Sequence, residues 1–392
     1  MRTMWKLSVP IMSALCFFGT GDHPAAAQQA RGENAGATIG EPRTFRLTYR
    51  EDGFDMRHQF YRAESEVEFK RLPAIKDRHP FTKLISSLEM GLLWDREGRK
   101  LYLDANRNGD LTDDPAYDGV MGDGDIQEFR GIRVKKGACP FTIGFIGYPQ
   151  GTGRLEMHIQ SAWQGEIELA GVRRALAVLT GPGQVSGSIA QAYLGLVPDA
   201  DGKTDLPVNS EPLKLDNARR PFVDGHDYTV SYDLDESTSP PTMVATFQEV
   251  ECKTTTKSFR GPDLLRVQVQ RQGGGVVVID RPRGDVVAPD DRFPMVVATL
   301  WRADDPEICL VGMTYRGSDN MRSDNMIFGE GLSQSLETHR YGPWINTRLL
   351  WKDRAGQTYA ALAVTPGKTA PRPKIAIRQG DTALFDGCLE YG

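Results

Sequence analysis

The sequence predicts a mainly β protein made of two or three antiparallel, sandwich-like or barrel-like domains. Apolar and polar residues alternate with period two in many short segments, such as residues 45–49, 228–232 and 265–269. Such alternation puts one face of a strand into a core and the other into water. Turn-forming residues are frequent, with 41 glycines and 24 prolines. Many short strands separated by turns are typical of sandwiches and barrels, and helical periodicity is limited to residues 80–90 and 331–338.

The first 27 residues have the pattern of a secretory signal peptide. Arg2 and Lys6 precede an apolar run over residues 7–18, and an Ala-x-Ala cleavage pattern ends at Ala27. The apolar run is shorter than the roughly 20 residues that a membrane-spanning helix needs, and no later segment approaches that length. We therefore expect a secreted or periplasmic protein with no membrane span after cleavage. An uncleaved anchor is the alternative.

The rest of the chain divides by composition and pattern. Residues 28–42 lack apolar periodicity and read as a flexible leader. We expect a first β-domain over residues 43–155, a second over 156–257 and a third over 258–392. In the third, a strand, a Gly/Pro turn and a longer strand follow one another over residues 276–301, a pattern that favours an immunoglobulin-like or transthyretin-like sandwich.

Four of the five cysteines lie beyond the predicted signal peptide: Cys139, Cys252, Cys309 and Cys388. An even number in an oxidising compartment predicts two disulfides, with three possible connectivities. We expect Cys309 to pair with Cys388. Free buried thiols are the alternative.

The charge pattern argues against a nucleic-acid partner. The chain has 47 Lys and Arg against 52 Asp and Glu, a net charge of −5. The basic residues are scattered among acidic ones, whereas nucleic-acid binding proteins gather them on one face or stripe. No nucleic-acid partner is therefore expected.

An acidic loop over residues 104–114 is the strongest candidate site. Calcium takes 6 to 8 oxygen ligands, and the EF-hand loop supplies them from positions 1, 3, 5, 7 and 9, with glycine at position 6. Gly109 stands at position 6. The remaining positions carry oxygen donors in the same order: Asp104, Asn106, Asn108, Asp110 and Thr112.

The end of the loop departs from the EF-hand pattern. Position 12 is Pro115 instead of a bidentate Glu, so Asp113 and Asp114 would have to close the ligand shell from a tighter loop. The preceding residues 100–103 alternate like a strand. We therefore expect a structural Ca²⁺ held by a strand-flanked loop. The alternative is an acidic turn without metal, because Asn, Asp and Gly dominate turns.

Three segments together resemble a group of proteins: the signal peptide, the loop over residues 101–114 and the ending at residues 390–392. They are similar to uncharacterised secreted multi-domain β-proteins of planctomycete-type bacteria, which carry an EF-hand-like loop. The resemblance is confined to those segments and implies no particular activity.

The sequence favours a non-enzymatic binding or assembly protein at the cell envelope, stabilised by the calcium loop. A glycan or a cell-envelope protein is the candidate partner. No catalytic motif is evident, since the histidines are dispersed and no Gly-x-Ser-x-Gly elbow occurs. The alternatives are a secreted hydrolase acting on polysaccharide, whose carboxylates converge only in the fold, and a structural module of a surface system.

Overall fold

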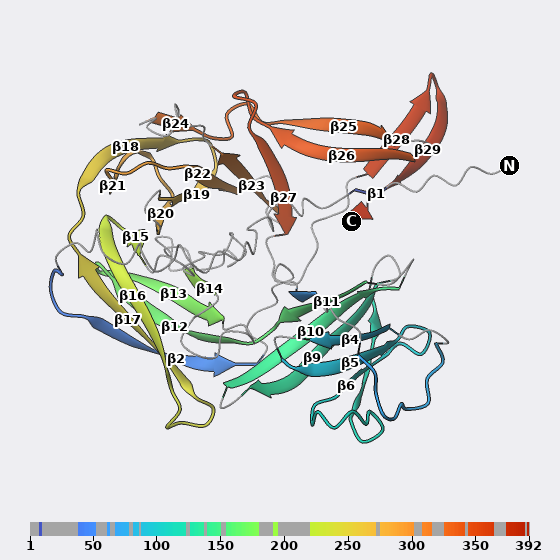
Figure 1. The fold of residues 1–392 in the computed structure, drawn as a ribbon. Helices are drawn as coiled ribbons and strands as arrows, with labels where there is room; N and C mark the ends of the chain where they lie inside the picture. Colours follow the sequence, from blue (N-terminus) through green and yellow to red (C-terminus); the bar gives the residue numbers. More distant parts are fainter. Residues whose placement is uncertain are drawn as a thin grey trace.

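The computed structural model contains thirty strands and no helix in the residues that it describes (Figure 1). The prediction of a mainly β protein is confirmed; its described strands form several antiparallel sheets and some that also contain parallel pairs. The described residues are 8–9, 38–51, 61–62, 67–77, 81–85, 88–122, 126–136, 139–149, 154–179, 191–194, 220–271, 275–301, 308–315, 325–341, 344–363, 374–388 and 390–391.

Two smaller sheets are built from the N-terminal part of the chain. A five-stranded sheet has the order β3-β11-β10-β9-β8, with β3 (Tyr61–Arg62), β11 (Arg154–Ile159), β10 (Cys139–Tyr148), β9 (Gln127–Lys136) and β8 (Val120–Met121). A four-stranded sheet has the order β4-β5-β6-β7, with β4 (Phe81–Ile85), β5 (Met90–Asp95), β6 (Lys100–Leu103) and β7 (Ala116–Asp118). The second of these carries the acidic loop between its last two strands.

One fourteen-stranded sheet runs through the rest of the molecule. Its first half consists of β14 (Gln191–Leu194), β13 (Val172–Leu179), β12 (Ala162–Leu169), β2 (Arg43–Arg50), β17 (Thr242–Val250), β16 (His226–Asp235) and β15 (Pro221–Val223). Its second half continues with β20 (Val276–Asp280), β19 (Leu264–Gln270), β22 (Met295–Trp301), β23 (Ile308–Tyr315), β27 (Thr358–Ala363), β26 (Trp344–Lys352) and β25 (Ser333–Tyr341).

Three small sheets complete the described structure. The largest comprises β21 (Gly284–Pro289), β18 (Thr254–Arg260) and β24 (Asn325–Ile327). The other two are the hairpin β28 (Lys374–Gln379) with β29 (Thr382–Cys388), and the parallel pair β1 (Ser8–Val9) with β30 (Glu390–Tyr391).

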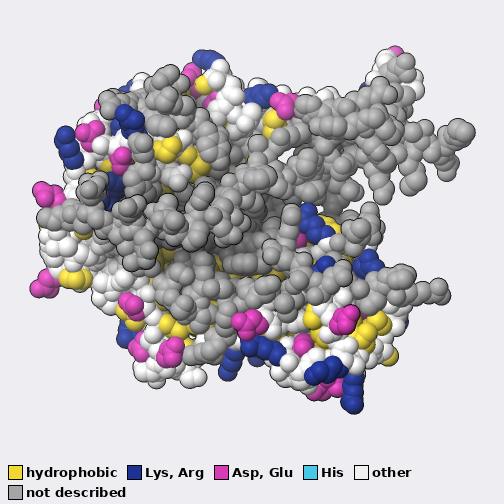
Figure 2. Space-filling model, viewed as in Figure 1, with side chains coloured by type: hydrophobic (Ala, Val, Ile, Leu, Met, Phe, Trp, Pro, Cys, Tyr) yellow, Lys and Arg dark blue, Asp and Glu magenta, His cyan; other side chains and the backbone are white. Residues whose placement is uncertain are grey.

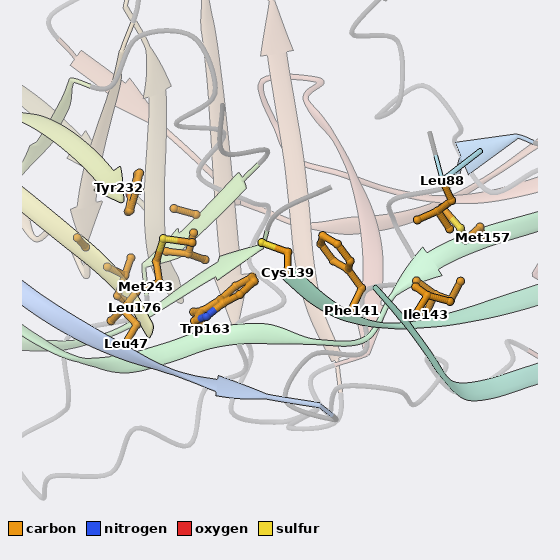
Figure 3. Close-up of a cluster of buried hydrophobic side chains, with 14 of the residues drawn as sticks. Leu47, Leu88, Cys139, Phe141, Ile143, Met157, Trp163, Leu176, Tyr232 and Met243 are labelled. Carbon is orange, nitrogen blue, oxygen red and sulfur yellow. The ribbon is translucent and has the colours of Figure 1, made fainter. Parts of the chain in front are cut away.

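The first hydrophobic core joins the small N-terminal sheets to the first half of the large sheet. Figure 3 shows Trp163 and Met243 of the large sheet on one side of Cys139, and Phe141 of the five-stranded sheet on the other. These side chains are almost completely buried. The predicted alternation is clear in β17, where Met243 and Phe247 point into this core and the residues between them are alternately half-buried and buried.

Strands β15 and β20 serve two cores at once. Phe222 of β15 and Val277 of β20 belong to the second core, which the C-terminal strands build. The next residue in each strand, Val223 and Val278, belongs to the first core. The two strands pair in parallel with Phe222 opposite Val277 and Val223 opposite Val278. Because successive side chains of a strand point to opposite faces, this pair of strands is a wall shared by the two cores.

Buried charges join β13 to the same wall. The completely buried Arg174 of β13 pairs with Asp280 of β20 at 2.5 Å and with Asp224, in the turn after β15, also at 2.5 Å. Arg266 of β19 reaches the other oxygen of Asp280 at 2.6 Å. Strand β13 is not a neighbour of β15, β19 or β20 in the sheet order. The large sheet therefore curls far enough to bring these strands together.

Glycine-bearing turns connect the hairpins as the sequence suggested. The β12–β13 turn has positive φ at both central residues, Ala170 (49°) and Gly171 (81°), and the β15–β16 turn has them at Asp224 (52°) and Gly225 (87°). Type I′ turns require this backbone, and glycine adopts it without strain. Ala170 lacks that freedom.

The two predicted helical stretches are wrong in the residues that the structure describes. Within residues 80–90, strand β4 leads by a turn into β5, and within 331–338 the chain enters β25. Both stretches are short, and pairing with a neighbouring strand satisfies backbone groups that one or two helical turns would leave open. The described residues also contain no helix long and apolar enough to cross a membrane.

The predicted pair of disulfides is wrong as well. Cys139, Cys252 and Cys309 are free thiols, so the structure contains neither the two predicted disulfides nor the pair Cys309–Cys388. Cys309 packs in a small cluster with Met295, Val297 and Val311, where burial raises the pKa of its thiol to about 11. The cysteine behaves as a small apolar core residue.

Of the predicted signal peptide, the structure describes only Ser8 and Val9; its other residues lie outside the described part of the chain.

Candidate functional site: the acidic loop

The acidic loop, residues 104–114, joins two paired strands. Strand β6 ends at Leu103 and β7 begins at Ala116, and the two strands pair with Tyr102 opposite Ala116. The predicted strand-like flank is therefore present on both sides of the loop. Leu111, inside the loop, is fully buried against Leu93 and Tyr102. This apolar contact fixes the middle of the loop on the four-stranded sheet.

Asp104 organises the turn from its first position. Its side chain is only 7% exposed. Its Oδ1 accepts a hydrogen bond from the backbone N–H of Asn108 at 3.1 Å, and its Oδ2 accepts one from the N–H of Gly109 at 3.0 Å. Gly109 has a φ of +77° and Arg107 a φ of +60°. The glycine has the left-handed backbone that its position in the motif predicts.

The next three residues with candidate oxygen ligands, Asn106, Asn108 and Asp110, repeat one local hydrogen-bond motif. The Oδ1 of Asn106 accepts from the N–H of Asn108 at 3.0 Å, and the Oδ1 of Asn108 accepts from the N–H of Asp110 at 2.6 Å. The Oδ1 of Asp110 accepts from the N–H of Thr112 at 3.0 Å. Side chains that bond the backbone two residues ahead form Asx-turns. The alternating positions thus hold their oxygens against the loop. The Oδ1 atoms of Asn106 and Asn108 each keep a further lone pair, whereas the Oδ1 of Asp110 also accepts from the Thr112 hydroxyl at 2.5 Å.

Asp113 and Asp114 close the loop from its far end. The Oδ2 of Asp113 accepts hydrogen bonds from the side-chain amides of Asn106 at 3.3 Å and Asn108 at 2.9 Å. The Oδ1 of Asp114 accepts from the N–H of Ala105 at 3.2 Å. The other oxygen of Asp114 is buried and has no hydrogen-bond partner in the described residues. The structure therefore brings the two ends of the predicted site together and leaves one buried oxygen unsatisfied.

The electrostatics of the loop differ between its two ends. Burial, followed by the negative charges of Asp104, Asp113 and Asp110, raises the pKa of Asp114 against the smaller opposing effect of the Ala105 N–H. The pKa of Asp110 is instead lowered, first by the hydrogen bonds from Thr112 and then by Arg71. The negative charges of Asp104, Asp113 and Asp110 thus act together on Asp114, whose second oxygen has no hydrogen-bond partner in the described residues.

A segment that the motif did not reveal binds the outer side of the loop. The backbone N–H groups of Lys70 and Arg71 donate to the carbonyl of Gly109 at 2.7 and 3.3 Å, and the N–H of Leu111 donates to the carbonyl of Arg71 at 3.1 Å. The ammonium of Lys70 donates to the Asn108 carbonyl at 2.7 Å, and Arg71 pairs with Asp110 at 3.3 Å. These contacts span more than thirty residues of sequence, so no local pattern could predict them.

The donor set suits a hard cation better than a soft one, because it consists of carboxylate, amide and carbonyl oxygens. Within the part of the chain that the structure describes, no three His, Cys, Asp or Glu side chains form a cluster that could hold a metal ion. A cation in this loop would therefore need the oxygens of Asn106 and Asn108 and main-chain carbonyls as well as the carboxylates.

Two other side chains that could carry chemistry, those of Trp163 and Asp95, are buried and hydrogen-bonded within the fold. Trp163 is buried in the first core and donates its indole N–H to the carbonyl of Pro241 at 3.0 Å, so its ring is not available to stack against a glycan. Asp95 is almost fully buried and accepts from the N–H groups of Lys76, Asp77 and Gly98 at 2.9–3.0 Å. That carboxylate holds a turn together.

The face shown in Figure 2 carries Lys and Arg interspersed with Asp and Glu over the described elements.

Comparison with known proteins adds no further information on function. No protein-family model, no curated protein and no solved structure matches this chain.

Proposed function

We propose that this protein is a secreted or periplasmic, non-enzymatic binding or assembly protein whose acidic loop holds a structural Ca²⁺. Asp104, Asn106, Asn108, Asp110, Thr112, Asp113 and Asp114 would supply the oxygen ligands. A glycan or a cell-envelope protein is the proposed partner class. The proposed location rests on the signal-peptide pattern of residues 1–27.

The observation that carries the calcium proposal is the unsatisfied oxygen of Asp114. A buried polar atom without a partner costs roughly 1–3 kcal/mol, and this atom belongs to a carboxylate whose pKa three neighbouring acids help to raise. A cation would give that oxygen a partner and would neutralise the mutual repulsion. The two strands that flank the loop leave it without a pair of helices to reorient, which favours a stabilising role over a signalling one.

The decisive variant is Asp114→Asn, because it should change stability in opposite directions with and without calcium. In chelator, the substitution removes a repelled, poorly solvated charge, so the melting temperature should stay the same or rise. In calcium, the variant should lose most of the stabilisation that the wild type gains. At a calcium concentration 100-fold above the dissociation constant, that gain is about 2.7 kcal/mol.

Asp118→Asn is the matched control. Asp118 pairs with Lys100 outside the loop and its side chain is 81% exposed, so this variant should keep the full calcium response. Asp104 is a poorer choice, since its carboxylate holds two backbone amides and its loss would disturb the metal-free loop. Wild-type protein that melts identically in calcium and in chelator would show that the loop is an ordinary acidic turn.

The hydrolase alternative gains no specific support from the described residues. A glycoside hydrolase needs two facing carboxyl groups at a defined separation, one with a raised pKa. Asp114 has the raised pKa, but it lies in a surface loop whose other acids are held by donors of that loop and by Arg71. The hydrolase alternative is tested by incubating the purified protein with polysaccharides and measuring the release of shorter sugars.

A further inference from the structure

A two-stranded ribbon extends from the end of the large sheet. Strands β25 and β26 pair along nine residues, from Ser333 opposite Lys352 to Tyr341 opposite Trp344. The other neighbour of β26, strand β27, pairs with it only at Trp351 and Lys352. Beyond that base, the two strands are hydrogen-bonded only to each other within the described residues, and they run away from the sheet (Figure 1). Strand β1 lies against β26, on the inner side of the ribbon, and leaves the outer edge of β25 without a paired strand in the described residues.

The outer strand of this ribbon is open to solvent. Strand β25 is the last in the sheet order, and Gln334 and Thr338 are exposed. Leu336, in the middle, is 50% exposed and stands opposite the half-buried Leu349 of β26. An isolated two-stranded ribbon is only marginally stable in water, and three or more strands are usually needed. An open edge also leaves a row of backbone donors and acceptors unpaired.

We propose that β25 pairs antiparallel with β25 of a second copy of this chain, in the register that places Leu336 opposite Leu336. A two-fold axis perpendicular to the ribbon keeps like faces together, so only such symmetric registers are allowed. In this register Leu349 and Leu336 of each copy form a row of four leucines across a four-stranded sheet. Ser335 meets Glu337, and Gln334 meets Thr338, without opposing like charges.

The neighbouring registers are less favourable. A register centred on Glu337 places two carboxylates directly opposite each other, which is unfavourable for a cross-strand pair even with Lys352 bound to Glu337 at 2.7 Å. A register centred on Ser335 places Leu336 opposite Gln334 and breaks the leucine row. One strand edge is a smaller contact than the roughly 800 Å² per partner of a standard interface. The association should therefore be weak and concentration-dependent, and it needs no calcium.

Disulfide trapping tests the register directly. Residues that stand opposite each other have Cβ atoms about 4.5–5.5 Å apart, close to the separation that a disulfide bridges. The Leu336→Cys variant should form a covalent dimer on mild oxidation. The Gln334→Cys variant is the control, because residue 334 would lie about 13 Å from its own copy along the strands. Mass spectrometry of the linked peptide identifies the bond, since the chain has other thiols.

Sedimentation from low micromolar to near-millimolar concentration tests the association itself. Leu336→Glu should raise the dimer dissociation constant at least about tenfold without changing the melting temperature of the monomer, because the residue is exposed. Three results would overturn the proposal: wild-type protein that stays monomeric throughout, a dimer that Leu336→Glu leaves intact, or cross-linking of the Gln334→Cys variant as fast as that of Leu336→Cys.

Discussion

Replacing Asp280 with asparagine should destabilise the protein more than any surface change, because this carboxylate neutralises two buried guanidinium groups. Its side chain is 3% exposed. Its Oδ1 accepts from Nε of Arg266 at 2.6 Å, and its Oδ2 accepts from Nη1 of Arg174 at 2.5 Å and Nη2 of Arg266 at 3.0 Å. Asparagine is nearly the same size, so the substitution removes the charge without creating a cavity.

The two arginines would be left in different situations. Arg174 keeps two hydrogen bonds to Asp224, at 2.9 and 2.5 Å. Arg266 keeps a hydrogen bond to the carbonyl of Leu194 at 2.7 Å, which carries no neutralising charge. Removing one partner of a buried ion pair costs about 3–5 kcal/mol, and we expect Asp280→Asn to fall in this range. Since whole proteins are stable by about 5–15 kcal/mol, the loss is a large fraction of the total.

Urea denaturation followed by fluorescence gives the free energy of unfolding, with an unchanged m value as the check that the variant unfolds in the same way. Asp285→Asn is the control. Asp285 is 66% exposed and pairs with Arg260 at 3.5 Å, so its loss should cost less than about 1 kcal/mol. Adding Arg266→Met to Asp280→Asn should recover part of the stability by removing a guanidinium whose charge Asp280 neutralised. A loss below about 1 kcal/mol for Asp280→Asn would refute the reasoning.

Three further predictions concern pH, a turn and a thiol. The two guanidiniums lower the pKa of Asp280 despite its burial, so its contribution is fully present above the unfolded value of about 3.9 and is lost as pH falls through the folded value; acid titration should therefore destabilise wild type more than Asp280→Asn. Ala170→Asn should raise stability by about 1 kcal/mol, because Asn tolerates the positive φ of a type I′ turn; a lower melting temperature would contradict this. Cys309, with its pKa raised to about 11, should resist alkylation at pH 8 in the native protein and react once it is unfolded; equal rates would show that the thiol is accessible.

Local patterns predicted the strands, the turns and the acidic loop, because period-two alternation, glycine at positive φ and Asx-turns depend on neighbouring residues. Asp104 accepts a hydrogen bond from the N–H of Gly109, and Gly109 has the positive φ expected of a glycine in a turn. The contacts of Lys70 and Arg71 with the loop could not be predicted, since they arise only when distant segments pack together. The cysteine prediction failed for a related reason. An even count shows that disulfides are possible, but only the fold shows that Cys309 is enclosed by Met295 and Val297.

The shared wall of β15 and β20 has a consequence for how the protein comes apart. Unfolding the C-terminal strands would expose Phe222 and Val277 on one face of the wall, and the same strands hold Val223 and Val278 in the other core. Neither core can lose its side of the wall without loosening the other. Backbone amides of these two strands should therefore be among the slowest in the molecule to exchange with solvent deuterium, opening only with the whole fold.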